Sequence, residues 1–231
     1  FQWDALLLET YFLSIFFVPW KVFDSKNNHK DPSRIGIWLL WLLVIKLMFQ
    51  SGLVKFTFFG ADGTNTWRDL TALNYHYWTQ PIPSWISYYV DKLPLVFDKI
   101  SLVFTYFCEL FVPFLIFLPR RARRFSGIIL IIFQFLIILT GNYGFFNLLT
   151  IIICFSLFDD QYLRNFLSKW FKADNISEKI EVYHEKLKYS ISILVLLCFI
   201  LTTIFFVKRD IRGSALNQVT TSNQPSAFEK K

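Results

Sequence analysis

The sequence predicts an all-α, polytopic membrane protein of about six spans, interrupted by one polar and aromatic segment. Hydrophobic residues make up 54% of the 231 residues, and 28 residues are Phe. Many of them lie in continuous apolar runs of about 15 to 20 residues, close to the length that a helix needs to cross a bilayer. Soluble domains of this size rarely contain such runs, so the composition favours the membrane class.

Six apolar stretches are the expected spans, and together they make residues 1–207 one membrane domain. They cover 3–20, 35–54, 100–118, 126–140, 144–158 and 189–207. The fourth and fifth stretches flank a Gly-Asn-Tyr-Gly turn and form a short hairpin, which requires tilt or local thinning of the bilayer. A surface helix is expected over 161–172. Residues 208–231 are rich in Ser, Thr, Asn and Gln, which predicts a disordered tail.

Basic residues predict the orientation of the chain. The loops 21–34, 119–125 and 159–188 contain four, four and six Lys and Arg residues, whereas the turn 141–144 contains none. An alternating path through six spans puts the three basic loops on one side, which the positive-inside rule makes cytoplasmic. The segment 55–99 is then extracytoplasmic.

The net charge of +7 comes from bases that lie beside apolar runs. This pattern suits the anionic headgroups of lipids better than nucleic acid, because the chain has no basic face on a soluble module. We therefore expect membrane lipids as partners and no nucleic acid.

The segment 55–99 is too polar to span a membrane and too aromatic to be a plain linker. Trp and Tyr at this density favour the headgroup zone, so we expect an interfacial or re-entrant segment with short helices near 67–73 and 83–92. Its centre, residues 66–83, is called the island below. Its candidate partner-binding or structural residues are Trp67, Arg68, Asp69, Tyr75, His76, Tyr77, Gln80 and Pro81.

Catalytic patterns in the island are weak. His76 is its one histidine, because His29 and His184 lie in the expected cytoplasmic loops. A histidine-based metal centre is therefore not expected, and neither is a cofactor. Ser84 and Ser87 lack a recognisable base and orienting group. A role for His76 as a lone general acid or base stays open.

The expected spans contain several polar residues, of which we single out Lys46, Gln50, Glu109 and Gln134. Ionisable groups in a bilayer are costly unless they are paired, so they usually face the interior of a bundle. One interpretation is a structural Lys46–Glu109 pair, and the other is a path for protons or substrate. Asp4 and Glu9 are expected to contact the edge of the island.

The island itself resembles the signature of the lipase maturation factor family, through its Trp67–Leu73, Tyr75–Tyr77 and Thr79–Pro83 blocks. Further blocks agree in the same order: residues 2–10, 109–114, 141–147 and 158–160. The resemblance covers residues 2–160 and is weak beyond them. The family's large C-terminal extramembrane domain and an earlier N-terminal span are absent from the chain, so it resembles a fragment of the membrane domain.

The resemblance implies an integral membrane protein that acts as a chaperone-like factor and not as a hydrolase. In animals the family resides in the endoplasmic reticulum and assists the folding and assembly of secreted dimeric lipases such as lipoprotein lipase. Bacterial relatives would lie in the cell membrane, often without animal lipase clients. The island would then be the extracytoplasmic working surface.

Two other function classes stay open. A membrane enzyme of the vitamin K-dependent carboxylase-like type would use His76 or Glu109 for proton chemistry. A small-solute transporter would use Lys46 and Glu109 along its path.

Overall fold

The computed structural model describes residues 2–18, 33–60, 63–80, 82–167 and 186–222. Every regular element in these ranges is helical, which confirms the all-α prediction. Four helical stretches are long and apolar enough to cross a membrane: Arg34–Thr57, Leu95–Phe117, Arg120–Thr140 and Tyr189–Arg209. The first and fifth expected spans correspond to shorter helices, α1 (Gln2–Phe17) and the stretch Phe146–Leu157.

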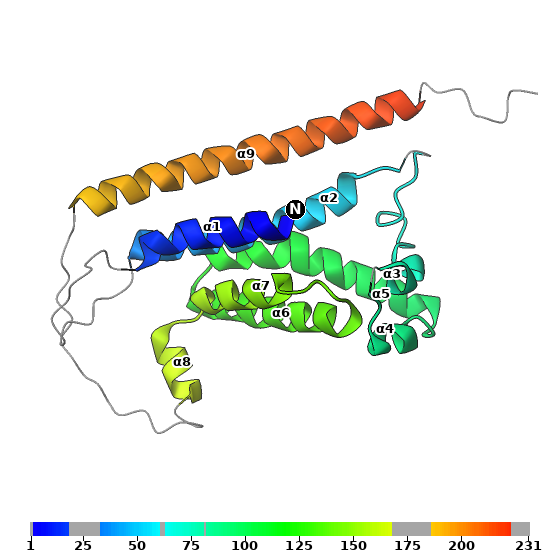
Figure 1. Cartoon of the computed structure of the whole chain (residues 1–231), viewed down its shortest axis with the longest axis horizontal. Helices are drawn as coiled ribbons and strands as arrows, with labels where there is room; N and C mark the ends of the chain where they lie inside the picture. The colour runs from blue at the N-terminus through cyan, green and yellow to red at the C-terminus, as the bar shows by residue number, and fades with distance from the viewer. Residues whose placement is uncertain (1, 19–32, 61–62, 81, 168–185, 223–231) are drawn as a thin grey trace, which may run out of the picture.

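Helix α2 (Arg34–Thr57) lies at the centre of the bundle, with α1 on one side and α9 on another (Figure 1). Its Leu39, Leu43 and Val44 side chains are fully buried and belong to the main apolar cluster. At its start, a Cβ on Gly36 would meet the carbonyl oxygen of Phe16 at 2.5 Å. Only glycine therefore allows α1 and α2 to approach so closely.

The third expected span begins earlier than predicted and changes its helical form twice. It comprises α5 (Leu95–Tyr106), a π-helical turn η1 (Phe107–Phe111) and a 3₁₀ stretch η2 (Val112–Phe117). Pro113 has no N–H, so the α-helical hydrogen-bond ladder cannot continue through it. The Val112 carbonyl accepts a hydrogen bond at 3.0 Å from the Ser126 hydroxyl on the next helix.

The expected hairpin consists of α6 (Arg120–Thr140), α7 (Phe146–Cys154) and the 3₁₀ turn η3 (Phe155–Leu157). One boundary is corrected: the basic stretch 119–125 is the beginning of α6 and not a loop. The Pro119 carbonyl accepts the N–H groups of Ala122 and Arg123, at 2.9 and 3.2 Å. Arginine also has a high helix propensity, which supports this first turn.

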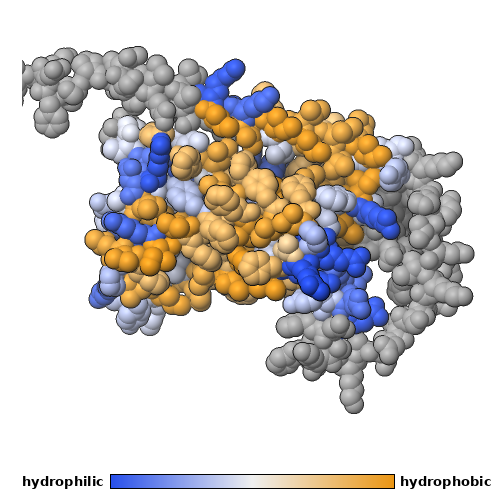
Figure 2. Space-filling view, turned by 180° about the vertical axis from the view of Figure 1, so that it is seen from behind, coloured by the Kyte–Doolittle hydropathy of each residue, from blue (hydrophilic) through white to orange (hydrophobic). Residues whose placement is uncertain are grey.

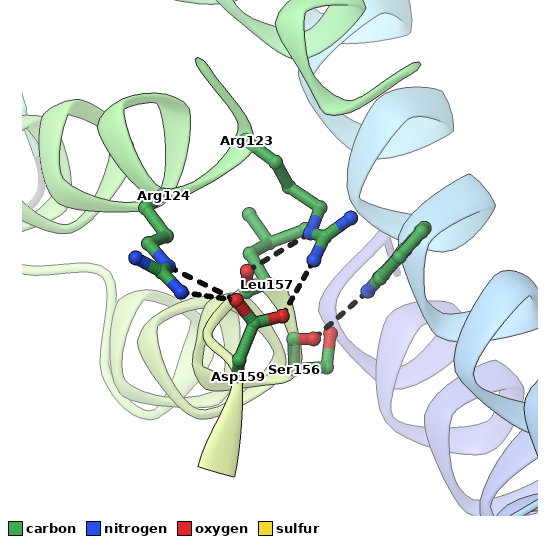
Figure 3. A network of polar contacts seen from close by, with 6 residues as sticks. Arg123, Arg124, Ser156, Leu157 and Asp159 are labelled. Atoms are coloured by element: carbon green, nitrogen blue, oxygen red, sulfur yellow. Dashed lines mark hydrogen bonds and ion pairs between the residues drawn. The ribbon is translucent and has the colours of Figure 1, made fainter. Parts of the chain in front are cut away.

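A charged cluster joins both helices of this hairpin at their basic end (Figure 3). The Asp159 carboxylate accepts hydrogen bonds from Arg123 Nη2 at 2.7 Å and from Arg124 Nη2 at 2.6 Å. Nearby, Trp41 Nε1 of α2 donates to the Ser156 carbonyl at 2.8 Å. Burial alone would raise the pKa of Asp159, but the hydrogen bonds and charges of the two arginines lower it. The cluster thus ties α6 and α7 together beside α2.

Beyond this cluster, α8 (Asp160–Leu167) begins where the surface helix was expected. The remainder of that helix and most of the segment 159–188 lie outside the described residues. Helix α9 (Lys186–Ser222) then packs along α2. It continues well past residue 207, so the tail predicted from 208 is helical as far as Ser222. The stretch contains no Pro that would end the helix earlier.

The two ends of the bundle differ in character. The helix ends next to the basic loops lie at one end of the molecule, and α3 and α4 of the island region lie at the other (Figure 1). Figure 2 shows hydrophobic side chains across the middle of the visible face and hydrophilic ones toward its margins. This distribution suits a bundle that lies across a membrane.

Candidate functional site

Asn65 links the end of α2 to the island. Its side chain is 4% exposed, and Nδ2 donates to the carbonyls of Lys55 and Phe56, both at 3.1 Å. Its Oδ1 accepts the N–H groups of Trp67 at 3.0 Å and Arg68 at 3.1 Å. Asn65 is not among the residues that the sequence motifs mark as candidates. The one feature of the sequence that points to it is its place two residues after the turn residue Gly63, because Asn often forms Asx turns at such positions.

The first short helix of the segment lies later than predicted. Residues 66–72 form turns, and α3 covers Leu73–Thr79. The Thr66 carbonyl accepts the N–H groups of Thr71 and Ala72, at 2.8 and 2.9 Å. Leu70 has φ 57°, a left-handed conformation that costs a branched residue about 1 kcal/mol or more. A helix over 67–73 is therefore excluded by the turn geometry that Asn65 begins.

Lys55 connects the island to the membrane-spanning helices. Its Nζ lies 2.6 Å from Glu109 Oε1 and 5.3 Å from the centroid of the Trp67 ring. A Cβ on Gly52 would meet Glu109 Cβ at 2.9 Å, so glycine allows α2 to approach η1 at this level. Glu109 is buried, and among the described residues its Oε2 has no hydrogen-bond partner.

The predicted Lys46–Glu109 pair is wrong, because Lys46 pairs with Glu9 of α1. Lys46 and Lys55 are nine residues apart, which is two and a half helical turns, so they point to opposite faces of α2. One faces α1 and the other faces η1. Glu9 accordingly contacts the middle of the bundle and not the edge of the island.

The two intramembrane glutamines lie elsewhere. Gln134 is buried, and its Nε2 lies 3.9 Å from the Met48 sulfur. Its backbone carbonyl accepts a hydrogen bond from Asn147 Nδ2 at 3.4 Å. Gln50 is half-buried on α2. The predicted polar residues therefore make separate contacts at the α1–α2, α2–η1 and α2–α6 boundaries.

Two side chains of the island, and Ser84 directly after it, fasten this region to the end of the α6–α7 hairpin. His76 Nε2 and the Tyr143 hydroxyl lie 2.9 Å apart, and Gln80 Nε2 donates to the Thr140 carbonyl at 2.9 Å. Ser84 Oγ, which also caps α4 (Trp85–Val90), donates to the Leu139 carbonyl at 2.7 Å. The hairpin turn predicted from the Gly-Asn-Tyr-Gly sequence thus becomes the base on which the island sits.

A cavity of about 290 Å³ lies at this junction, lined mainly by the residues before α4 and by the turn 141–144. A Cβ on Gly141 would meet Gln80 Oε1 at 3.1 Å and the Tyr143 ring at 2.6 Å. A larger residue at position 141 would therefore displace the Tyr143 ring where the hairpin turn meets the island.

Burial keeps two titratable groups of the island, His76 and Tyr77, in their neutral forms. Burial lowers the pKa of His76 below 6.5, and the nearby positive charge of Lys55 lowers it further. Burial, together with the charges of Asp98 and Asp91, raises the pKa of Tyr77 to about 12. At neutral pH the imidazole is uncharged and the Tyr77 phenol is protonated, so these groups act as hydrogen-bonding and packing residues.

The predicted motif residues divide into an inner and an outer set. Tyr77 is buried and Trp67, His76 and Gln80 are half-buried, so they hold the island in place. The outer set is exposed and consists of Arg68, Asp69 and Tyr75, with Trp78 beside them. Pro81 lies outside the described residues. Next to the outer set, Trp85 of α4 is 88% exposed.

Comparison with known proteins shows which domain family contains this site. Residues 1–165 match the lipase maturation factor transmembrane domain. The chain is 47% identical over 168 residues to lipase maturation factor 2 of Xenopus tropicalis, covering 72% of this chain and 23% of that protein. It is 39% identical over 163 residues to lipase maturation factor 1 of Homo sapiens, covering 71% and 28%.

The chain spans about a quarter of the length of these relatives. No solved structure matches it. The domain match includes α1 to α7, the island and the hairpin turn beneath it, and ends within α8. This chain therefore belongs to the lipase maturation factor family.

Proposed function

We propose that this chain is the membrane-embedded part of a chaperone-like factor that assists the folding and assembly of secreted lipases, without being an enzyme itself. The observation that carries the proposal is the family match across the whole island and the turn that supports it. The relatives' names supply the client class. In a eukaryotic cell the protein would reside in the endoplasmic reticulum membrane, and in a bacterium in the cell membrane.

The outer set of the island is the proposed working surface. Asp69, Tyr75 and Trp78 are exposed and stand on a turn-and-helix unit that is fastened at several points. Aromatic residues supply much of the binding energy at protein interfaces, and a rigid support reduces the entropy lost on binding. A fixed surface of this kind suits transient contact with a folding client.

The enzyme and transporter alternatives have less support in the geometry. The His76 imidazole is neutral and engaged with the Tyr143 hydroxyl. Lys46 and Glu109 belong to two ion pairs on opposite faces of α2, so they do not form one path. These contacts favour structural roles for the residues on which both alternatives depend.

The test uses the full-length protein that contains this chain, expressed in cells that lack their own lipase maturation factors. A secreted dimeric lipase is expressed with it, and lipase activity in the medium is measured. We expect the Tyr75→Ala/Trp78→Ala variant to accumulate normally and to lower secreted lipase activity. The matched control is Phe205→Ala, an aromatic of similar exposure on α9 beyond the matched region. Unchanged lipase activity in the double variant would contradict the proposed surface.

A second variant separates the chaperone from an enzyme. In the His76→Gln variant, the lipase should still co-purify with the protein, and most of the lipase activity in the medium should remain. If it abolished secreted activity while the lipase still co-purified, His76 would have a chemical role and the non-enzymatic proposal would fail.

A further inference from the structure

Arg68 lies where the island meets the membrane-spanning helices, and its side chain is turned toward them. Its guanidinium carbon is 5.3 Å from the centroid of the Phe56 ring, in the last turn of α2. Among the described residues, Arg68 has no carboxylate within ion-pair distance. An exposed guanidinium without a counter-ion at this level has its full set of N–H donors available to a ligand.

Tyr106, at the end of α5, supplies a second polar group at the same place. Its ring meets the edge of the Phe56 ring at a centroid distance of 6.1 Å. Its hydroxyl is buried and has no hydrogen-bond partner among the described residues, and it lies within the electrostatic reach of Arg68. A buried hydroxyl without a hydrogen-bond acceptor lowers the stability of the fold, so this position favours a bound acceptor. Both donors therefore adjoin the Phe56 ring, and neither has an acceptor among the described residues.

Glu109 does not serve as that acceptor for Arg68, because it pairs with Lys55. Glu109 also acts on the Tyr106 hydroxyl, but its charge is offset by Lys55 at 2.6 Å. Lys55 and Glu109 neutralise each other, so the charge of Arg68 remains without a counter-ion among these three residues. An anion that offers several oxygen acceptors would satisfy both Arg68 and Tyr106.

An apolar track leads away from this pair toward the basic end of the bundle. It consists of Phe107, Phe111 and Phe114, all of them exposed on the membrane-spanning stretch that follows Tyr106. The rings of Phe107 and Phe111 stack at 6.4 Å, so they share one face. From Tyr106 to Phe114 the track covers about 12 Å at the rise of a helix.

We propose that Arg68 and Tyr106 bind the phosphate of a phospholipid in the leaflet on the island's side, with an acyl chain along Phe107, Phe111 and Phe114. The planar guanidinium fork matches two phosphate oxygens, and the tyrosine hydroxyl donates to a third acceptor. A free phosphate or a client carboxylate would use the donors and leave the aromatic track unused. The lipid would fill the angle between α2, η1 and the island, independently of any client.

The test uses the purified full-length protein, stripped of lipid in detergent, and measures its thermal unfolding midpoint. Phosphatidylglycerol, diacylglycerol and inorganic phosphate are added separately. We expect the phospholipid to raise the midpoint at concentrations where the other two have no effect. Arg68→Gln should weaken the apparent affinity for the phospholipid about tenfold, as expected for a lost charge-assisted contact. Tyr106→Phe should weaken it less, and Phe111→Ala should weaken it without changing the response to inorganic phosphate.

The matched control is Arg121→Gln, an exposed arginine at the opposite end of the bundle. It should leave the phospholipid response unchanged. A full response in both Arg68→Gln and Tyr106→Phe would overturn the proposal. An equal shift with inorganic phosphate would instead indicate a free-anion site. If Arg68→Gln reduced lipase co-purification and kept the lipid response, Arg68 would be a client contact and the lipid assignment would be wrong.

Discussion

Lys55 contacts a carboxylate, an aromatic ring and a helix carbonyl at the same time. Its Nζ meets Glu109, faces the Trp67 ring and lies 3.5 Å from the Ser51 carbonyl. Since Glu109 is buried, removing its partner leaves an uncompensated charge. We expect Lys55→Met to cost about 3 kcal/mol of stability, measured by unfolding in mixed micelles.

Two comparisons show whether this loss arises from the ion pair. The double variant Lys55→Met/Glu109→Gln should lose less stability than the sum of the two single variants, because the partners interact. Lys46→Met is the control. Its partner Glu9 is 37% exposed, so the loss should be smaller. Equal losses for the two lysines would argue against a special role for the Glu109 pair.

His76 gives the island a dependence on pH. Its folded-state pKa is lowered by burial first and by Lys55 second, from the value of 6.5 expected in the unfolded chain. The unfolded state therefore binds the proton more readily, and stability is lost as pH falls below about 6.5 toward the folded-state pKa. We expect the unfolding midpoint to drop more between pH 7.5 and 5.5 in the native protein than in His76→Gln. Parallel curves would exclude His76 as the titrating group.

At the scale of elements, Asn65 defines the shape of the island, since it caps α2 and begins the turn that follows. Replacing it with Ala removes two donors and an acceptor from buried backbone partners, at a cost of about 1 to 2 kcal/mol. We expect Asn65→Ala to speed hydrogen exchange in residues 63–80 and to leave α6 protected. Asn142→Ala, which loses one exposed contact to Gly144, is the control. Equal exchange in both variants would contradict this role.

The elements could be predicted because apolar length and turn residues are local properties of the sequence. The α2 span, the hairpin turn and α4 lie close to their expected positions. The partners of charged residues could not be predicted, because they depend on which helices become neighbours: Lys46 faces α1, and Glu109 faces Lys55. The shift of α3 had a different cause: Leu70 takes a positive φ and the Thr66 carbonyl accepts the N–H groups of Thr71 and Ala72, which ends the first turn before a helix can continue.

At the scale of the whole molecule, polar contacts concentrate at the two ends of an apolar bundle. At one end Asp159 joins the arginines of α6, and at the other the island is fastened to the turn after Thr140. The ends are linked through α2 and α6, which extend from one to the other (Figure 1). Such a frame lets the island keep a fixed orientation relative to the membrane, which a client surface and a lipid site both require.

This arrangement makes the orientation of the chain testable. If the basic loops are cytoplasmic, Asp69 and Arg121 must lie on opposite sides of the membrane. Both side chains are exposed, so Asp69→Cys and Arg121→Cys can be introduced singly into a Cys198→Ser background, since the other two native thiols are buried. In sealed microsomes a membrane-impermeant maleimide should label Arg121→Cys at once and Asp69→Cys only after permeabilisation. Immediate labelling of both would place the island and the start of α6 on one side and would refute the alternating path.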